Sequence, residues 1–181
     1  MSAAAPTFRI AGAADVARIA RLHAESWRVA YRGILTDTFL DGPVFGDREL
    51  LWHARINEGR DGPLRVILME DATELVGFGS LCPEADPAFG VLLDNLHVRP
   101  GARGVGLGTR LLGAIADDVV AVQPDAALHL WVLEENHDAR AFYRRRGGEE
   151  LGMEIHRMPD GGDHACLRVV WRDLRAAHPF A

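Results

Sequence analysis

The sequence predicts one domain of the α/β or α+β class, built around a mixed sheet. Its 181 residues are the length of a single ordinary domain. A composition of 48% hydrophobic and 25% charged residues is typical of a soluble protein with a proper core. Segments with strand and helix periodicity alternate through the middle of the chain, and two strand-like segments end it, which favours a mixed sheet. We expect one domain over residues 1–181, with 1–6 and 176–181 as loose termini.

The first third of the chain is expected to be mainly helical. Val16, Ile19 and Ala30 recur at helical spacing after a capping aspartate. The expected elements are a strand at 8–10, a helix that Asp15 caps and Gly33 ends, a turn or short helix at 36–40, and a helix at 47–57 stopped by Gly59.

The rest of the chain changes to short apolar runs separated by turn residues and two helical segments. Residues 70–73 read as a hairpin turn. The expected strands are 64–69, 75–81, 91–98, 128–133, around 151–157 and around 166–171, and the expected helices run from Leu107 to before Pro124 and from Asn136 through Arg146.

The charged residues exclude several classes of enzyme. All 20 cationic residues are Arg, so the chain has no lysine for a Schiff base and none for the phosphate loop of nucleoside triphosphatases. The net charge of −6 argues against nucleic acid as a partner. His156, Asp163 and His164 do not have metal-ligand spacing, so we expect no metal.

The two cysteines, Cys82 and Cys166, lie far apart, which favours a reduced, cytoplasmic protein. The start of the chain lacks the features of a signal peptide, and no run of about 18 apolar residues occurs. We therefore expect no membrane association.

A glycine-rich loop at residues 103–108 lies between an expected strand and an expected helix. Backbone N–H groups and the helix dipole make such a turn an anion site. Residues 99–112 and 139–148 hold seven of the 20 arginines and no acid, which favours a small polyanionic ligand. A tight turn without a ligand is the alternative. A Rossmann dinucleotide site is disfavoured, because the third glycine is one place early and the loop lies past mid-chain.

Two segments carry recognisable motifs: residues 93–108, with Arg103, Gly106 and Gly108, and residues 136–147, with Asn136 and Tyr143. Together they resemble the motifs of the GNAT superfamily of acetyl-CoA-dependent N-acetyltransferases. Residues 93–100 with 103–108 resemble its first motif, whose Gln/Arg-x-x-Gly-x-Gly/Ala pattern is met by Arg103, Gly106 and Gly108. The second motif, Asn-x-x-Ala-x-x-x-Tyr-x-x-x-Gly, is met by Asn136, Ala139, Tyr143 and Gly147. Gly148 departs from the family, which usually has Phe or another large apolar residue there. We expect this departure to weaken local packing and to leave the cofactor site intact, and it leaves the shape of the acceptor site open.

The resemblance implies a GNAT-type fold with a mixed, mostly antiparallel central sheet flanked by helices, and acetyl-CoA as co-substrate. It implies that backbone groups of Leu96 and Val98, with His97 between them, pair with the pantetheine arm. Asn136 would hydrogen-bond that arm, and Tyr143 would protonate the leaving thiolate. The pyrophosphate would be held by backbone N–H groups of Arg103, Gly104, Val105, Gly106, Leu107, Gly108 and Thr109.

The acceptor site is less specified. Trp27 and Tyr31 share a helix face that in this family usually walls the acceptor pocket, although core packing of Trp27 is an equal alternative. On the strand at 91–98, alternation places Asp94 opposite Asn95 and His97. One of these three is a candidate to carry a proton from the amine, and Asn95 is an acceptor-site candidate. A structural polar role is the alternative for each.

The function implied is an N-acetyltransferase that moves acetyl from acetyl-CoA to a primary amine by direct nucleophilic attack. The acceptor would be a small molecule or a peptide or protein amine, and a homodimer is a family-level expectation. One alternative is a non-catalytic acyl-CoA-binding regulatory protein on the same fold. A nucleotide-dependent oxidoreductase is a second alternative, disfavoured by the glycine spacing.

Overall fold

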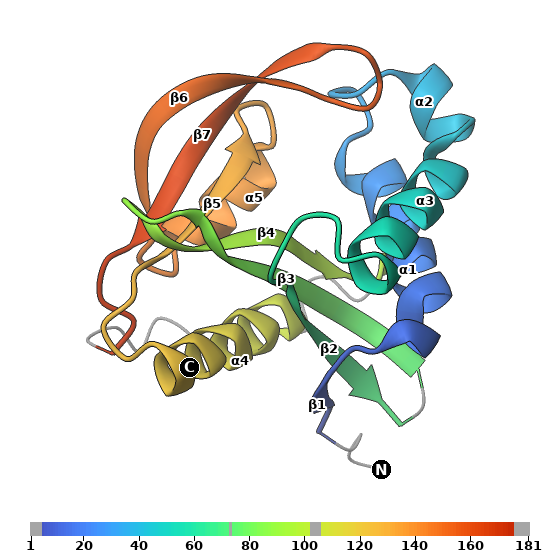
Figure 1. Cartoon of the computed structure of the whole chain (residues 1–181). Coiled ribbons are helices and arrows are strands. Elements are labelled where there is room, and N and C mark those ends of the chain that lie inside the picture. The colour runs from blue at the N-terminus through green and yellow to red at the C-terminus, as the bar shows by residue number, and fades with distance from the viewer. Residues whose placement is uncertain (1–4, 73, 102–105, 176–181) are drawn as a thin grey trace.

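The computed structural model of the chain describes residues 5–72, 74–101 and 106–175 (Figure 1). The elements in chain order are β1 (Thr7–Ile10), a 3-10 turn η1 (Ala13–Asp15), α1 (Val16–Ala30), α2 (Asp37–Asp41), α3 (Val44–Asn57), β2 (Arg65–Asp71), β3 (Glu74–Asp86), β4 (Gly90–Val98), α4 (Leu107–Val122), β5 (Leu128–Leu133), α5 (His137–Arg144), β6 (Glu149–Arg157) and β7 (Asp163–Trp171). Within these residues, no helix is both long and apolar enough to cross a bilayer.

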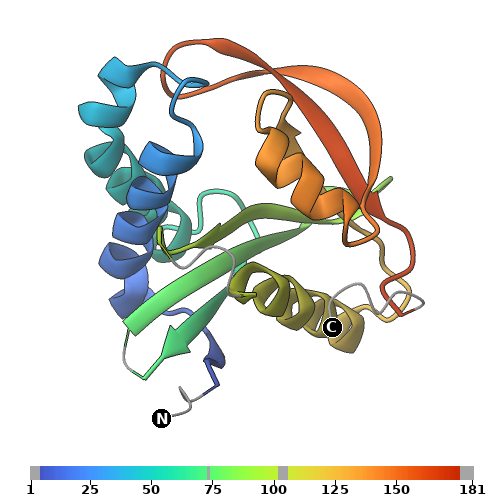
Figure 2. The same ribbon diagram turned by 180° about the vertical axis from the view of Figure 1, so that it is seen from behind.

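The strands form a seven-stranded sheet in the order β1-β2-β3-β4-β5-β7-β6. Every neighbouring pair is antiparallel except β4 and β5, which are parallel. Helices α1 and α3 lie on one side of the sheet and α4 on the other, while the β6–β7 hairpin arches over toward α2 (Figures 1 and 2). The predicted mixed, mostly antiparallel fold is confirmed.

The sheet separates two clusters of buried apolar side chains, one on each face, and the helices contribute to them with residues at helical spacing. Ile19 of α1 and Trp52 of α3 pack with Phe78 of β3 on one face. Leu111 and Ile115 of α4 pack with strand residues on the other face. Burying side chains of this size contributes roughly 1.5–3 kcal/mol each, so these two faces fix how the helices dock.

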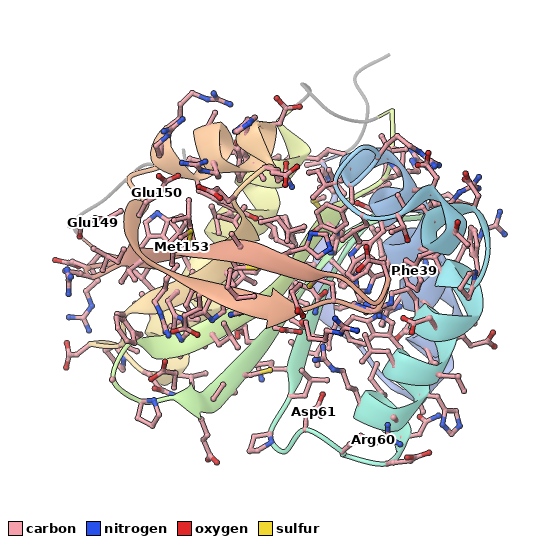
Figure 3. All side chains as sticks on the ribbon, turned by 90° about the horizontal axis from the view of Figure 1, so that it is seen from above. Phe39, Arg60, Asp61, Glu149, Glu150 and Met153 are labelled. Atoms are coloured by element: carbon pink, nitrogen blue, oxygen red, sulfur yellow. The ribbon has the colours of Figure 1, made fainter. Side chains whose placement is uncertain are left out.

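Several element boundaries differ from the sequence prediction. Helix α3 begins at Val44 rather than Asp47, because Pro43 serves as its N-cap and proline is well tolerated where a helix starts. Strand β3 continues to Asp86, past the predicted end at residue 81. Figure 3 shows the side chains from above, where β6 and β7 cross over the rest of the sheet.

Strand β4 contains a bulge at Asp94. Ser80 of β3 pairs with Asn95, yet the next residue of β3 pairs with Leu93, so Asp94 is an extra residue. The expected alternation therefore fails, and the prediction that Asp94 lies opposite Asn95 is wrong: the Asn95 side-chain amide donates to the Asp94 carboxylate, which also pairs with Arg55.

The bulge changes which β4 residues face α4. Val91 and Leu93 belong to the apolar cluster under α4 before the bulge, whereas Leu96 and Val98 pack against that cluster after it. Asn95 and His97 consequently face α1. Along the last residues of β4, alternate side chains therefore face the α4 cluster and helix α1.

Strands β4 and β5 pair at only two positions. Val91 pairs with Leu128 and Leu92 with His129. Beyond these pairs, β4 continues to Val98 and β5 to Leu133 without further pairing between them. An opening is therefore built into the middle of the sheet.

Candidate functional site

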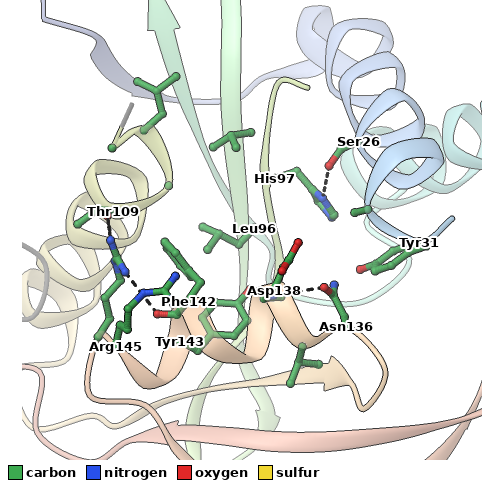
Figure 4. Close-up of a pocket in the computed structure, with 18 of the residues that line it drawn as sticks. Ser26, Tyr31, Leu96, His97, Thr109, Asn136, Asp138, Phe142, Tyr143 and Arg145 are labelled. Carbon is green, nitrogen blue, oxygen red and sulfur yellow. Dashed lines mark hydrogen bonds between the residues drawn. The ribbon is translucent and has the colours of Figure 1, made fainter. Parts of the chain in front are cut away.

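A cavity of about 430 Å³ lies at this opening (Figure 4). Its walls come from the end of α1, the end of β4, the start of α4, the end of β5 and the length of α5. Five elements from distant parts of the chain thus meet where β4 and β5 separate.

One end of the cavity has the chemistry of an anion site. Gly106 caps α4 in the left-handed conformation, with φ of +80°, and residues 106–109 line the cavity. The first N–H groups of a helix have no intrahelical partner and carry partial positive charge. Arg103, Gly104 and Val105, predicted for the same role, lie outside the described residues.

Two arginines reinforce this end. Arg145 and Arg146 line the cavity. Arg146 stacks 4.1 Å from the centroid of the Phe142 ring and donates through Nε to Thr109 Oγ1 at 2.9 Å. Arg140, from the same predicted basic window, instead forms an ion pair with Glu150 at 2.9 Å. Only part of that window is therefore available to a polyanion.

The cofactor-arm residues predicted on β4 also line the cavity. Leu96, His97 and Val98 belong to its wall, on the stretch of β4 that has left β5. The strand edge facing the opening has no sheet pairing there. An extended amide-bearing chain could form main-chain hydrogen bonds with that edge, as an added strand does.

Asn136 lines the cavity while it caps α5. Its Oδ1 accepts a hydrogen bond from the backbone N–H of Ala139 at 3.2 Å. Because a backbone N–H requires an acceptor, the oxygen of the amide is assigned to the cap. The Nδ2 group is then the part that can donate to a ligand.

Tyr143 lies in the same wall and is 9% exposed. Burial, together with the nearby Tyr31, raises the pKa of Tyr143 above its usual value of 10. The hydroxyl is protonated at neutral pH, as it would be at its usual pKa, so its proton is available to a leaving group.

Trp171 packs against Tyr143 and explains the unusual Gly148. The two aromatic rings meet edge to face at 5.8 Å, and Trp171 Nε1 donates to the Arg146 carbonyl at 2.7 Å. A Cβ on residue 148 would lie 2.9 Å from the Trp171 ring and 2.5 Å from Val169. The prediction of weaker packing is wrong, because the large aromatic side chain at this place comes from β7: Trp171 packs directly against Gly148.

The opposite end of the cavity holds an imidazole. His97 Nδ1 lies 3.0 Å from Ser26 Oγ, and both residues line the cavity. His97 stacks 4.5 Å from His23, whose Nδ1 accepts from Trp52 Nε1 at 2.9 Å. Burial first, and then proximity to His97, lower the pKa of His23 well below its usual value. His23 is thus a neutral support behind His97.

The three acceptor-site candidates are placed differently. Tyr31 lines the cavity, with its ring 5.1 Å from that of Trp27. Trp27 is 6% exposed and belongs to an apolar cluster, outside the cavity lining. Asn95 is buried as well, donating to Ser80 Oγ at 2.9 Å rather than lining the cavity.

Sequence reasoning missed several lining residues, chiefly Ser26, Trp131, Asp138 and Phe142. Phe142 could have been found, because it is three residues from Ala139 on the motif helix and so shares its face. Ser26 stands four residues before Ala30, but Ala30 was predicted only as part of an apolar helix stripe, so it did not mark Ser26 as a site residue. Trp131 carried no such signal, because a strand residue reaches the cavity only through the separation of β4 and β5.

Comparison with known proteins identifies the relatives of this arrangement. The model of a family described as "Acetyltransferase (GNAT) family" matches residues 19–148. A probable N-acetyltransferase of Mycobacterium tuberculosis is 26% identical over 172 residues, covering 94% of this chain and 95% of the relative.

Solved structures share the fold. A GCN5-related N-acetyltransferase from Rhodopseudomonas palustris superimposes with a TM-score of 0.73 at 19% identity, over 95% of this chain and 98% of that one. The PaiA N-acetyltransferase of Thermoplasma acidophilum, solved with coenzyme A, gives 0.66 at 18% identity, over 94% and 100%.

Proposed function

The chain belongs to the GNAT acetyltransferase family, and from that premise we propose that it transfers acetyl from acetyl-CoA to a primary amine by direct nucleophilic attack. The observation that carries the proposal is the position of Tyr143, a buried phenol in the wall of a cavity whose other end suits phosphate. A structural neighbour solved with coenzyme A supports the choice of donor.

The donor's pyrophosphate would lie at residues 106–109, near Arg145 and Arg146. Its pantetheine amides would pair with the free edge of β4 at Leu96 and Val98, and Asn136 would donate to the same arm. These contacts would place the thioester inside the cavity that Tyr143 and His97 both line.

The chemical step has a simple balance. The neutral amine nitrogen attacks the thioester carbon, the carbon–sulfur bond breaks, and the leaving sulfur takes the Tyr143 hydroxyl proton. The amine nitrogen releases one proton as the amide forms, and we assign this proton to His97, the imidazole that lines the cavity. No covalent enzyme intermediate is needed.

Calorimetry with acetyl-CoA and thiol release across a panel of amines test the function together. We expect binding of acetyl-CoA and amine-dependent release of free thiol. Binding without thiol release from any amine would favour the non-catalytic regulator, and absence of binding would refute both.

Tyr143→Phe tests the role of the phenol. Loss of a positioned acid typically costs 10²- to 10⁴-fold in rate, so we expect kcat to fall at least about 100-fold while affinity for acetyl-CoA stays nearly unchanged. Glu135→Gln is the control, because Glu135 is exposed and does not line the cavity. A Tyr143→Phe enzyme with an unchanged kcat would remove Tyr143 as the acid.

A further inference from the structure

Asp138 is the one acid among the described residues that line the cavity. It lies in the first turn of α5, and Figure 4 shows its side chain on the side of the cavity that holds Tyr31 and His97. Within the described residues, no cation forms an ion pair with its carboxylate. Asp138 is exposed, and binding of the acetyl donor gives no reason for a carboxylate without an ion pair at this position.

The cavity is electrically polarised along α5. Arg145 and Arg146 follow the C-terminal end of the helix, whereas Asp138 stands at its N-terminal end. At 1.5 Å per residue, seven residues of helix separate opposite charges by roughly 10 Å. A polyanion is attracted to the arginine end and repelled from the Asp138 end, which leaves the Asp138 end for a ligand of opposite charge.

We propose that Asp138 binds the ammonium group of the acceptor amine and holds it beside Tyr31 before transfer; this proposal rests on the proposed function. Primary amines of ordinary basicity, with pKa near ~10, are cations at neutral pH. A carboxylate and an aromatic side chain that line one cavity form a chemically suitable site for such a cation. The bound ammonium would lose one proton to solvent before attack, which leaves His97 free to accept the second proton, released by the nitrogen as the amide forms.

Asp138 also has a purely structural role to be separated from this one. An acid in the first turn of a helix stabilises it through the helix dipole. Glu135 offers a matched control: it is an exposed acid just before the same helix and does not line the cavity. Asp138→Asn and Glu135→Gln therefore remove the same charge near the same helix end.

The experiment measures steady-state kinetics of thiol release with butylamine, phenethylamine and trialanine amide as acceptors. For Asp138→Asn we expect KM for the amines to rise about tenfold, the size of a lost charge-assisted hydrogen bond. KM for acetyl-CoA and kcat at saturating amine should stay within about twofold of wild type. Glu135→Gln should leave all three parameters unchanged.

An unchanged amine KM in Asp138→Asn would overturn the proposal, as would an equal rise in Glu135→Gln. A lowered melting temperature in both variants, without a change in amine KM, would assign Asp138 to helix stability alone and so also overturn it. If wild type binds acetyl-CoA but acetylates none of the amines, the proposed function itself fails.

Discussion

Replacing Gly148 by alanine should destabilise the protein, although only one methyl group is added. The new Cβ would lie 2.5 Å from Val169 Cγ1 and 2.9 Å from the Trp171 ring, both of which are buried at 2% exposure or less. Trp171 cannot simply retreat, because its Nε1 is bound to the Arg146 carbonyl. Overpacking of this kind typically costs 1–3 kcal/mol.

For a chain of this length, each kcal/mol shifts the melting temperature by roughly 2–4 °C. A cost of about 2 kcal/mol therefore predicts a decrease of roughly 4–8 °C, measured by calorimetry or circular dichroism. Because Trp171 packs edge to face on Tyr143, kcat should fall as well.

Gly46→Ala is the matched control for this prediction. Gly46 is exposed in the first turn of α3, and an added Cβ meets nothing within 4 Å. Alanine there should stabilise the helix by up to about 1 kcal/mol. A Gly148→Ala protein as stable as wild type would refute the account of Trp171 as the side chain that fills this space.

Three further predictions concern other parts of the molecule. Gly106→Asp should abolish acetyl-CoA binding in calorimetry, because it places a carboxylate at the anion site and an L-residue at a φ of +80°; retained affinity would exclude this loop from phosphate binding. Hydrogen bonds from Arg9 lower the pKa of Asp15 from 3.8 to about 2, so its stabilisation is present above pH 3.8 and is lost as pH falls toward 2; urea midpoints of wild type and Asp15→Asn should converge over that range, and a constant difference would contradict the pairing. Burial raises the pKa of both Cys82 and Cys166 to about 11, so a thiol reagent at pH 7.5 should label them only after unfolding; rapid labelling of the folded protein would show that these sites open.

The sequence predicted the fold well where periodicity is local. The helix that begins after Asp15 follows from a single apolar stripe, and the observed α1 starts at Val16 and ends at Ala30, three residues before the predicted Gly33. The bulge at Asp94 could not be predicted, because an extra residue in one strand is visible only against its partner, β3. As a result, Asp94 was predicted on the wrong face of the sheet.

The spacing of residues within the motifs predicted part of the candidate site. Asn136 and Tyr143 line one cavity, as their seven-residue separation on a helix allows. Trp131 and Ser26 reach the same cavity from elements far apart in the chain, and their inclusion depends on how the sheet opens. The role of Trp171 opposite Gly148 depends in the same way on the pairing of β7 with β5.

The early separation of β4 from β5 also bears on hydrogen exchange. Amides in the middle strands of a sheet are usually among the last to exchange, because they open only with global unfolding. On β4, those amides beyond Leu92 that point toward β5 have no sheet partner across the opening. They should exchange quickly although they lie near the centre of the molecule, and a ligand that pairs with this edge should slow them. The centre of the sheet would thus report occupancy of the cavity more directly than its periphery.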